Sequence, residues 1–164
     1  MLAIDLAIDL RPVCPADDEL IARLFAESRP DLDLLPADLR GELLDLQQRA
    51  QHAEHAAAYP GATHDIVVAN GVDVGRIILD VSIAETRVVD LVVARDHRRR
   101  GIATAVLADV LAQADDSACP VVLSVWPTNH PAIDLYTGLG FETVAGDGVH
   151  VAMRRDTPEQ KDRS

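Results

Sequence analysis

The segment from residue 87 to residue 126 restricts the fold more than any other part of the chain. Its two β-branched runs, residues 87–94 and 121–126, predict strands. Between them, residues 101–114 carry apolar side chains at helical spacing, which predicts an amphipathic helix. Two strands joined by a helix form a βαβ unit, whose strands are parallel and whose crossover is right-handed. We therefore expect a mixed α/β fold that contains a parallel pair of strands.

The flanking segments predict further strands. Two β-branched runs after His64 are joined at Asn70-Gly71, a dipeptide typical of tight antiparallel hairpins. Residues 2–11 alternate apolar and other side chains, which predicts a half-buried strand. Near the end of the chain, residues 141–146 and 149–155 predict a closing hairpin.

Three further segments predict helices. The first begins at Pro15, with acidic residues in its first turn, and stops before Pro30. The second runs from about Pro36 toward Tyr59, and residues 129–138 predict a third, short helix. The whole pattern indicates one domain over residues 1–155, followed by a polar, frayed tail at residues 156–164.

Composition excludes several classes of protein. The 164 residues carry a formal net charge of −12, whereas nucleic-acid binding normally uses a basic surface, so we expect no nucleic-acid partner. No apolar run approaches the ~20 residues that a membrane helix needs. The amino terminus has no basic leader before an apolar stretch, and Cys14 and Cys119 have no short-spaced partner. We expect a cytoplasmic protein without membrane contact.

Positive charge is concentrated in the turn that precedes the helix at residues 101–114. Residues 95–100 hold four arginines and one aspartate, and Gly101 follows them. Backbone N–H groups at a helix amino terminus form a natural anion site, and glycine lets the backbone approach a phosphate closely. A solvated arginine-rich surface turn explains the same residues. Neither the Walker loop nor the dinucleotide fingerprint is present.

Two motifs give this turn a more specific reading. Residues 98–103, RRRGIA, resemble the R/Q-x-x-G-x-G/A loop of the GNAT acetyltransferases. Residues 129–141, NHPAIDLYTGLGF, resemble the N-x-x-A-x-x-x-Y-x-x-x-G-F segment of the same family. The chain departs from the family at Arg95, where proline is frequent, and at Ala103, where a second glycine is frequent. The resemblance covers the chain from about residue 64 onward, and earlier residues match only in the order of their elements.

The resemblance implies the GNAT fold, a mostly antiparallel central sheet in which the parallel pair splays apart to bind acetyl-CoA as cosubstrate. It also implies that main-chain groups of strand 87–94 contact the pantetheine arm and the acetyl carbonyl. The cofactor-binding residues implied in this way are Leu91, Val92, Val93, Arg98, Arg99, Arg100, Gly101, Ile102, Ala103, Thr104 and Asn129. Leu91, Val92 and Val93 are equally explained as core strand residues, and Asn129 as a helix N-cap.

The resemblance assigns catalysis to two residues. Tyr136 matches the family tyrosine near the thioester sulfur and is expected to protonate the departing thiolate. Asp90 is a candidate general base, because a carboxylate within an apolar strand is costly unless it is paired or used. Pairing with Arg87 or another arginine explains Asp90 as well. Glu85, Asp80, His64 or water alone are the alternatives.

The acceptor is less defined than the cofactor. The carboxylate-rich residues 31–46 could attract a protonated amine of a small molecule or peptide, although a solvated acidic helix face explains them better. His52 and His55 lack further ligands at a recognisable spacing, so no metal is expected. Two rival functions are a catalytically silent acetyl-CoA sensor and a nucleotide- or phosphate-binding module that does not use CoA. A homodimer is among the open oligomeric states.

Overall fold

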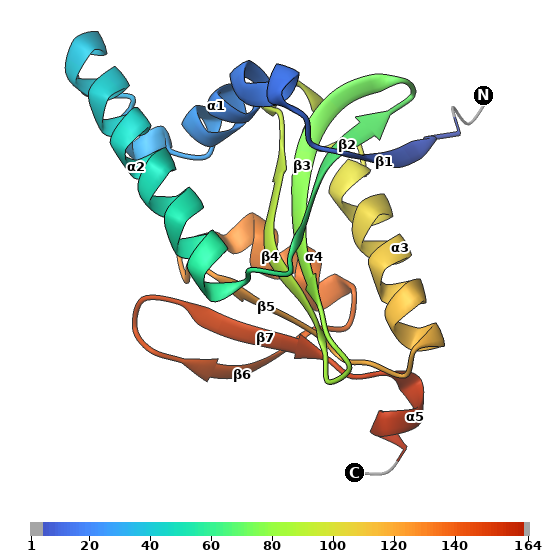
Figure 1. The fold of residues 1–164 in the computed structure, drawn as a ribbon. Helices are drawn as coiled ribbons and strands as arrows, with labels where there is room; N and C mark the ends of the chain where they lie inside the picture. The colour runs from blue at the N-terminus through green and yellow to red at the C-terminus, as the bar shows by residue number, and fades with distance from the viewer. Residues whose placement is uncertain (1–4, 163–164) are drawn as a thin grey trace. The chain divides into compact units, whose positions relative to one another are not determined.

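The computed structural model of the chain describes residues 5–162 (Figure 1). Its strands are β1 (Ile8–Pro12), β2 (Thr63–Ala69), β3 (Val72–Val81), β4 (Thr86–Val93), β5 (Val121–Val125), β6 (Glu142–Gly146) and β7 (Val151–Arg155). Its helices are α1 (Asp18–Glu27), α2 (Ala37–Ala58), α3 (Ile102–Asp116), α4 (His130–Gly138) and α5 (Pro158–Lys161). Single 3₁₀ turns, η1 (Pro15–Asp17), η2 (Pro30–Leu32) and η3 (Arg95–His97), precede α1, α2 and α3.

All seven strands form one sheet, in the order β1-β2-β3-β4-β5-β7-β6. β1 pairs antiparallel with β2, and β7 pairs antiparallel with both β5 and β6. β4 and β5, which the sequence places on either side of α3, pair in parallel. The predicted mixed α/β fold and its βαβ unit are therefore confirmed.

The chain divides into two compact units, each built from two segments. The first unit comprises Met1–Ile78 and Asp90–Ile102, and the second comprises Leu79–Val89 and Ala103–Ser164. In the first unit, β2 and β3 supply fully buried side chains such as Ile66 and Ile77. In the second, Leu107 of α3 and Phe141 are buried to a similar degree. The single domain over residues 1–155 stays a prediction.

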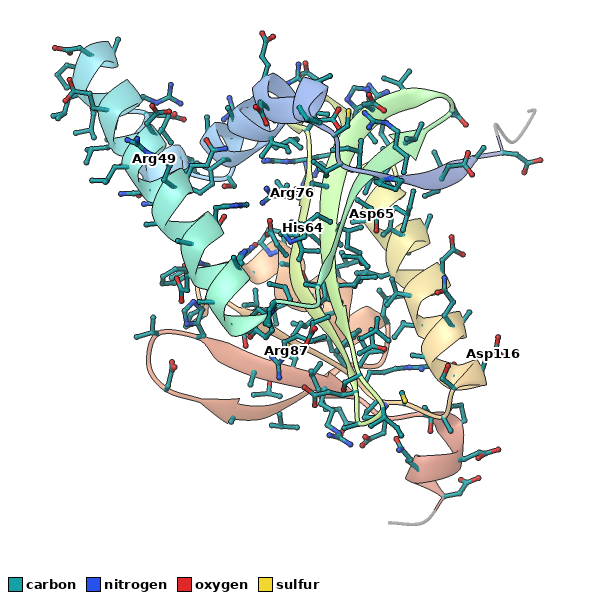
Figure 2. The ribbon with its side chains drawn as sticks, in the orientation of Figure 1. Arg49, His64, Asp65, Arg76, Arg87 and Asp116 are labelled. Atoms are coloured by element: carbon teal, nitrogen blue, oxygen red, sulfur yellow. The ribbon has the colours of Figure 1, made fainter. Side chains whose placement is uncertain are left out.

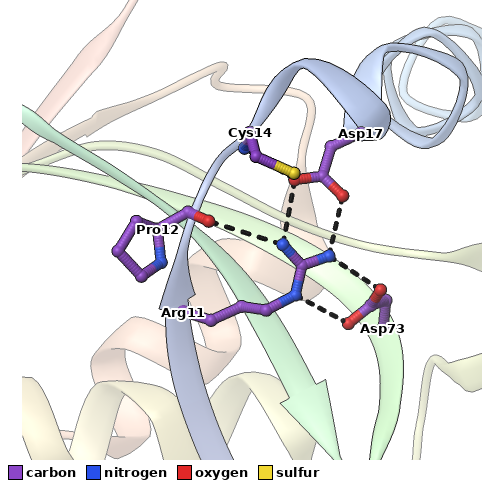
Figure 3. A network of polar contacts seen from close by, with 5 residues as sticks. All are labelled: Arg11, Pro12, Cys14, Asp17 and Asp73. Carbon is purple, nitrogen blue, oxygen red and sulfur yellow. Dashed lines mark hydrogen bonds and ion pairs between the residues drawn. The ribbon is translucent and has the colours of Figure 1, made fainter.

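In the first unit, a network around Arg11 ties β1 to η1 and β3 (Figure 3). The Arg11 guanidinium donates to both carboxylate oxygens of Asp17, at 2.9 and 2.7 Å, and to both oxygens of Asp73, at 3.2 and 2.8 Å. Asp17 also accepts a hydrogen bond from the Cys14 main chain. The hydrogen bonds from Arg11 and Cys14 hold the pKa of Asp17 well below its usual value.

The strand predicted over residues 2–11 is shorter than expected. β1 begins at Ile8, whose partner is Ala69, the last residue of β2. Asn70 and Gly71 then turn the chain with φ angles of 49° and 78°, so β2 offers no partner further along. Ala7 instead exchanges hydrogen bonds with Asn70. Residues 2–4 of the predicted strand lie outside the described residues.

The carboxyl terminus is more ordered than expected. Thr157 is buried, at 1% exposure, and opens the one-turn helix α5. The Thr157 main chain donates to Gln160 Oε1 at 3.2 Å, which is one of the two hydrogen bonds of a capping box. The prediction of a tail frayed from residue 156 is therefore wrong for α5. Within residues 5–162, no helix combines the length and the apolar character that crossing a membrane requires.

Candidate functional site

The turn between β4 and α3 has an unusual backbone. After η3, Arg99 has φ 61° and Gly101 has φ 79°, and α3 begins at Ile102. Glycine adopts positive φ freely, whereas an arginine there is strained. Such conformations persist where the surrounding structure enforces them, and they are enriched at ligand sites. The turn therefore presents backbone N–H groups in a non-helical arrangement next to a helix amino terminus, the geometry of an anion-binding concavity.

Glu27, at the end of α1, anchors the beginning of this turn. Its carboxylate accepts a 2.7 Å hydrogen bond from the main-chain N–H of Arg95. Its carbonyl accepts one of 3.3 Å from the guanidinium of Arg98, whose Nε also donates to the Val93 carbonyl at 2.9 Å. The Arg98 side chain therefore holds the turn against β4 and α1. No pattern in the sequence pointed to Glu27, because the contact joins residues far apart in the chain.

Arg99 and Arg100 differ from Arg98. Both side chains are exposed, and no described residue forms an ion pair or hydrogen bond with either guanidinium. Ile102, the first residue of α3, is buried at 3% exposure and holds the first turn of the helix against the core. Ala103 is half-buried and Thr104 is exposed. Two unmatched positive charges thus flank the strained turn, which suits an anionic ligand.

β4 runs close to β3 where the main-chain contacts are expected. A Cβ at Gly75 would lie 2.4 Å from the carbonyl oxygen of Val92, a distance that real Cβ atoms do not show. Gly75 therefore permits the observed path of β4. Val93 is buried, and Leu91 and Val92 are half-buried, as core strand residues would be. A glycine inside a β-branched run could have pointed to this close approach from the sequence.

The parallel ladder between β4 and β5 is short. It contains the pairs Thr86–Val121, Arg87–Val122 and Val88–Leu123. Val89 and Ser124, the next residues of these two strands, do not pair with each other, although both strands continue. β5 pairs with β7 as far as Val125. The parallel strands therefore stop pairing after Val88, as a splayed pair requires.

Asp90 is not a free carboxylate. Its Oδ2 lies 2.6 Å from Nη2 of Arg76 on β3, and both side chains are largely buried, at 26% and 12% exposure. The anticipated alternative, pairing with an arginine, is what the structure contains, and Arg87 pairs with Glu85 instead. This ion pair explains why a carboxylate is tolerated within β4, and it favours a positioning role for Asp90.

His64, at the start of β2, is half-buried in the same unit (Figure 2 labels His64 and Arg76). Burial, together with the positive charges of Arg76, His52 and His55, lowers the pKa of His64 below its usual value, against a smaller opposite effect of Asp65. The imidazole is therefore neutral at neutral pH and able to accept a proton. Among the described residues, no three His, Cys, Asp or Glu side chains form a group that could hold a metal ion.

In the second unit, Asn129 immediately precedes α4 and Tyr136 lies on it. Asn129 caps the helix, because its Oδ1 accepts a 3.3 Å hydrogen bond from the Ala132 main chain, so the N-cap interpretation is confirmed. Tyr136 is half-buried, with its ring centroid 5.7 Å from that of Phe141. Trp126, just after β5, is 58% exposed, and its ring centroid lies 4.5 Å from that of the half-buried His150, with the two rings tilted by 47°. The sequence did not indicate this aromatic pair.

The predicted site residues thus fall into two groups. The first unit brings together residues 90–93 of β4 and residues 98–102 of the turn, and the second contains Ala103, Thr104, Asn129 and Tyr136. The second unit also has a cavity of about 310 Å³ between the β3–β4 hairpin and α3, lined by residues such as Ile83 and Cys119. None of the predicted site residues lines that cavity.

The acidic segment at residues 31–46 is partly neutralised. Asp31 accepts two hydrogen bonds from Arg29, at 2.9 and 2.7 Å. Asp33 accepts one of 2.7 Å from Arg40. These local ion pairs reduce the attraction that the segment could exert on a cationic acceptor, and they favour the structural explanation of its carboxylates.

Comparison with known proteins connects this geometry to a family. The sequence profile described as the Acetyltransferase (GNAT) family matches residues 21–141. No curated protein matches the chain significantly. Among solved structures, the PaiA N-acetyltransferase of Thermoplasma acidophilum, in complex with coenzyme A, is similar with TM-score 0.68 and 14% identity. The similarity covers 92% of this chain and 99% of that one.

Two further structures have the same fold. The ribosomal-protein-S18-alanine N-acetyltransferase of Escherichia coli has TM-score 0.61 and 19% identity, over 92% of this chain and 94% of that one. A GNAT family acetyltransferase of Elizabethkingia anophelis, with acetyl-CoA bound, has TM-score 0.57 and 16% identity, over 94% and 99%. At these identities the likeness concerns the fold.

Proposed function

Because the chain belongs to the GNAT acetyltransferase family and is therefore an acyltransferase, we propose that it transfers the acetyl group of acetyl-CoA to a primary amine. The amine attacks the thioester directly, in a ternary complex. The observation that carries this proposal is the turn before α3, where a strained backbone, a helix amino terminus and two unmatched arginines coincide. The acceptor is a small molecule or a peptide.

The turn would hold the diphosphate of the cofactor. Main-chain N–H groups of residues 98–104 are the expected donors, because backbone donors at a helix amino terminus favour an anion without the entropy cost of ordering long side chains. Arg99 and Arg100 would add charge from the solvent side. Arg98 would act indirectly, since its guanidinium already donates to the Val93 and Glu27 carbonyls.

The pantetheine arm and the acetyl carbonyl would contact β4. Strand residues 91–93 offer main-chain groups, and the polarised carbonyl becomes more electrophilic when it accepts a hydrogen bond from a backbone N–H. Asn129 would reach the arm through its side-chain amide group while its Oδ1 caps α4. The close approach of β3 and β4 at Gly75 would set the position of the Val92 peptide group.

The proton movements then follow from the bonds exchanged. The amine nitrogen bonds to the acetyl carbon, the carbon–sulfur bond breaks, and the thiolate takes a proton from the Tyr136 hydroxyl. The amine must lose one proton to a base. The Asp90 carboxylate is engaged with Arg76, so His64 or water is the better-suited acceptor of that proton, with Asp90 holding Arg76 in place.

A screen of amines that follows thiol release tests the function, repeated with Tyr136→Phe. We expect turnover of at least one amine and a loss in kcat of about 100-fold in the variant, the usual contribution of a general acid, with CoA affinity retained. Tyr59→Phe is the matched control, because Tyr59 is the other of the two tyrosines and lies at the carboxyl-terminal end of α2. Unchanged turnover in Tyr136→Phe would remove that residue from its role.

A thermal-shift comparison separates the rival functions. A ligand that binds only the native state raises its stability by mass action. We expect acetyl-CoA and CoA to raise the Tm and ATP and NAD to leave it unchanged. Stabilisation by ATP or NAD alone would indicate a phosphate-binding module, and CoA binding with no amine turned over would indicate a sensor.

A further inference from the structure

Helix α2 is long and poorly covered. It has 22 residues, all of them described, and none of their side chains is buried. A helix of this length extends about 33 Å. Because helices in proteins gain most of their stability from packing an apolar face, such a helix is unusual unless something else covers it.

One side of α2 carries a continuous apolar stripe. Its members alternate at spacings of four and three residues, which keeps them on one line of the helix. They are Leu39, Leu43, Leu46, Ala50, Ala53 and Ala57. Leu39 and Leu46 are 44% and 59% exposed, the three alanines are exposed, and Leu43 is half-buried.

The stripe is separate from the polar contacts that α2 makes within its own unit. The contacts of α2 with its own unit use a different side of the helix, where Arg40 donates to Asp33 and Gln47 accepts a hydrogen bond from Arg29. Leu34, three residues before α2, is 95% exposed and extends the apolar area at the amino-terminal end. The stripe therefore remains open to a partner.

The order of residue sizes along the stripe points to a second copy of the same helix. The leucines occupy the first half of α2 and the alanines the second half. In an antiparallel pair, the leucines of each helix face the alanines of the other, so large side chains meet small ones along the whole contact. A parallel pair would instead place leucine on leucine and leave gaps between the alanines.

Charge favours the same arrangement. The first half of α2 carries Asp38, Glu42 and Asp45 against Arg40, and is acidic. The second half carries one arginine, Arg49, one glutamate, Glu54, and two histidines, so it is neutral or weakly basic. An antiparallel pair brings each acidic half beside the partner's less acidic half, whereas a parallel pair brings the two acidic halves together.

We propose that the apolar stripe of α2 is a homodimer interface, in which α2 packs antiparallel on α2 of a second copy about a two-fold axis near residue 48. Leu46 then lies opposite Ala50 of the partner subunit, and Leu39 opposite Ala57 of the partner subunit. The interface is isologous, as closed dimers are. It does not depend on the proposed acetyl transfer.

Sedimentation equilibrium of the full chain tests the dimer. We expect wild type to be dimeric at micromolar concentration and Leu39→Glu/Leu46→Glu to weaken the dimer by at least about 100-fold, because each charge would be buried against an apolar partner. Ile83→Glu is the control: Ile83 is 99% exposed in the second unit, so this change should leave the dimer intact. Circular dichroism checks that both variants fold.

A wild-type chain that remains monomeric at about 200 μM overturns the proposal, since a specific interface binds more tightly than that. A double glutamate variant that dimerises as wild type does also overturns it, because the stripe would then lie outside the interface.

Disulfide trapping tests the direction of the helices, in a chain carrying Cys14→Ser and Cys119→Ser. Mixing Leu39→Cys with Ala57→Cys should give the crosslinked heterodimer, recognised by its mass, whereas Leu39→Cys alone should not crosslink. A crosslink between two Leu39→Cys chains would show the parallel arrangement and contradict the proposal.

Discussion

Two arginine sites of the first unit differ in how their charge is used. Arg11 donates to two carboxylates, those of Asp17 and Asp73, and to the Pro12 carbonyl. Arg99 and Arg100, in contrast, extend from a turn of strained backbone and meet no partner among the described residues. The first site joins three elements of the fold (Figure 3), and the second precedes a helix amino terminus.

This difference separates structural charge from functional charge. An arginine that pairs with carboxylates of its own chain stabilises the fold, so its removal should lower the stability and leave ligand binding unchanged. An unmatched arginine contributes little to folding, and its charge is available to a ligand. In a chain with net charge −12, a local excess of unmatched positive charge at a strained turn is the clearest sign of an anionic ligand.

The largest effect is expected from Gly101→Glu. The change forces a residue with a Cβ into φ 79° and places a carboxylate in the diphosphate site, so CoA affinity should fall by at least about 100-fold, as like charges repel. Titration calorimetry with CoA measures it. Gly71→Glu is the matched control, because Gly71 has φ 78° and equally open surroundings in the β2–β3 turn. Equal losses in both variants would mean that backbone strain, not the anion site, is responsible.

A smaller effect is expected from Gly75→Ala. The new Cβ would lie 2.4 Å from the Val92 carbonyl oxygen, so β4 must shift, at a cost of about 1–3 kcal/mol in unfolding free energy. Because β4 is expected to hold the acetyl group, kcat/KM should also fall, by about 10-fold or more.

Gly41→Ala provides the contrast, because Gly41 lies in α2 with nothing near its Cβ and alanine should stabilise the helix by about 0.5–1 kcal/mol. Chemical denaturation and steady-state kinetics measure both variants. If Gly75→Ala were destabilised but had unchanged kinetics, the position of β4 would not affect the reaction.

Substitution of the arginines tests the difference between unpaired and paired positive charge. Arg99→Gln/Arg100→Gln should weaken CoA binding by about 5–10-fold, an effect that shrinks at high salt, and should leave the Tm unchanged. Arg11→Gln should do the reverse, lowering the Tm while the folded protein binds CoA as wild type does. If Arg11→Gln weakened binding and the double variant did not, the distinction between matched and unmatched charge would fail.

The smallest effect concerns acid stability. The pKa of Asp17 in the folded chain lies below its usual value of 3.8, so its ion pair stabilises the fold above that value and ceases to do so as pH falls through the folded pKa. Asp17→Asn should therefore be less stable than wild type at neutral pH, and the difference should narrow as the pH falls below about 4. Urea denaturation at several pH values measures it, and a constant difference would contradict the assigned pKa shift.

Much of the architecture could be predicted because it depends on local signals. Asn70 and Gly71 both take the positive φ that their hairpin needs, and Pro36 precedes α2 as expected. The capping box from Thr157 to Gln160 was also present in the sequence and predicts α5, although a polar composition suggested fraying. The end of β1 was not predictable in this way, because the length of β2 decides it.

The site was only partly predictable, because some of its residues are positioned by contacts between distant segments. The motif places Gly101 and Tyr136, since family loops keep a fixed residue spacing. Strand register, however, decides that Asp90 pairs with Arg76, and contacts between distant segments decide that Glu27 anchors the turn. Long-range pairings of this kind leave no periodic pattern in one sequence.

A crystal structure with CoA bound would show whether main-chain donors of the turn hold the diphosphate. We expect diphosphate oxygens within about 2.7–3.2 Å of main-chain nitrogens in residues 98–104, with the pantetheine arm along β4. A cofactor bound elsewhere, with this turn empty, would contradict this expectation.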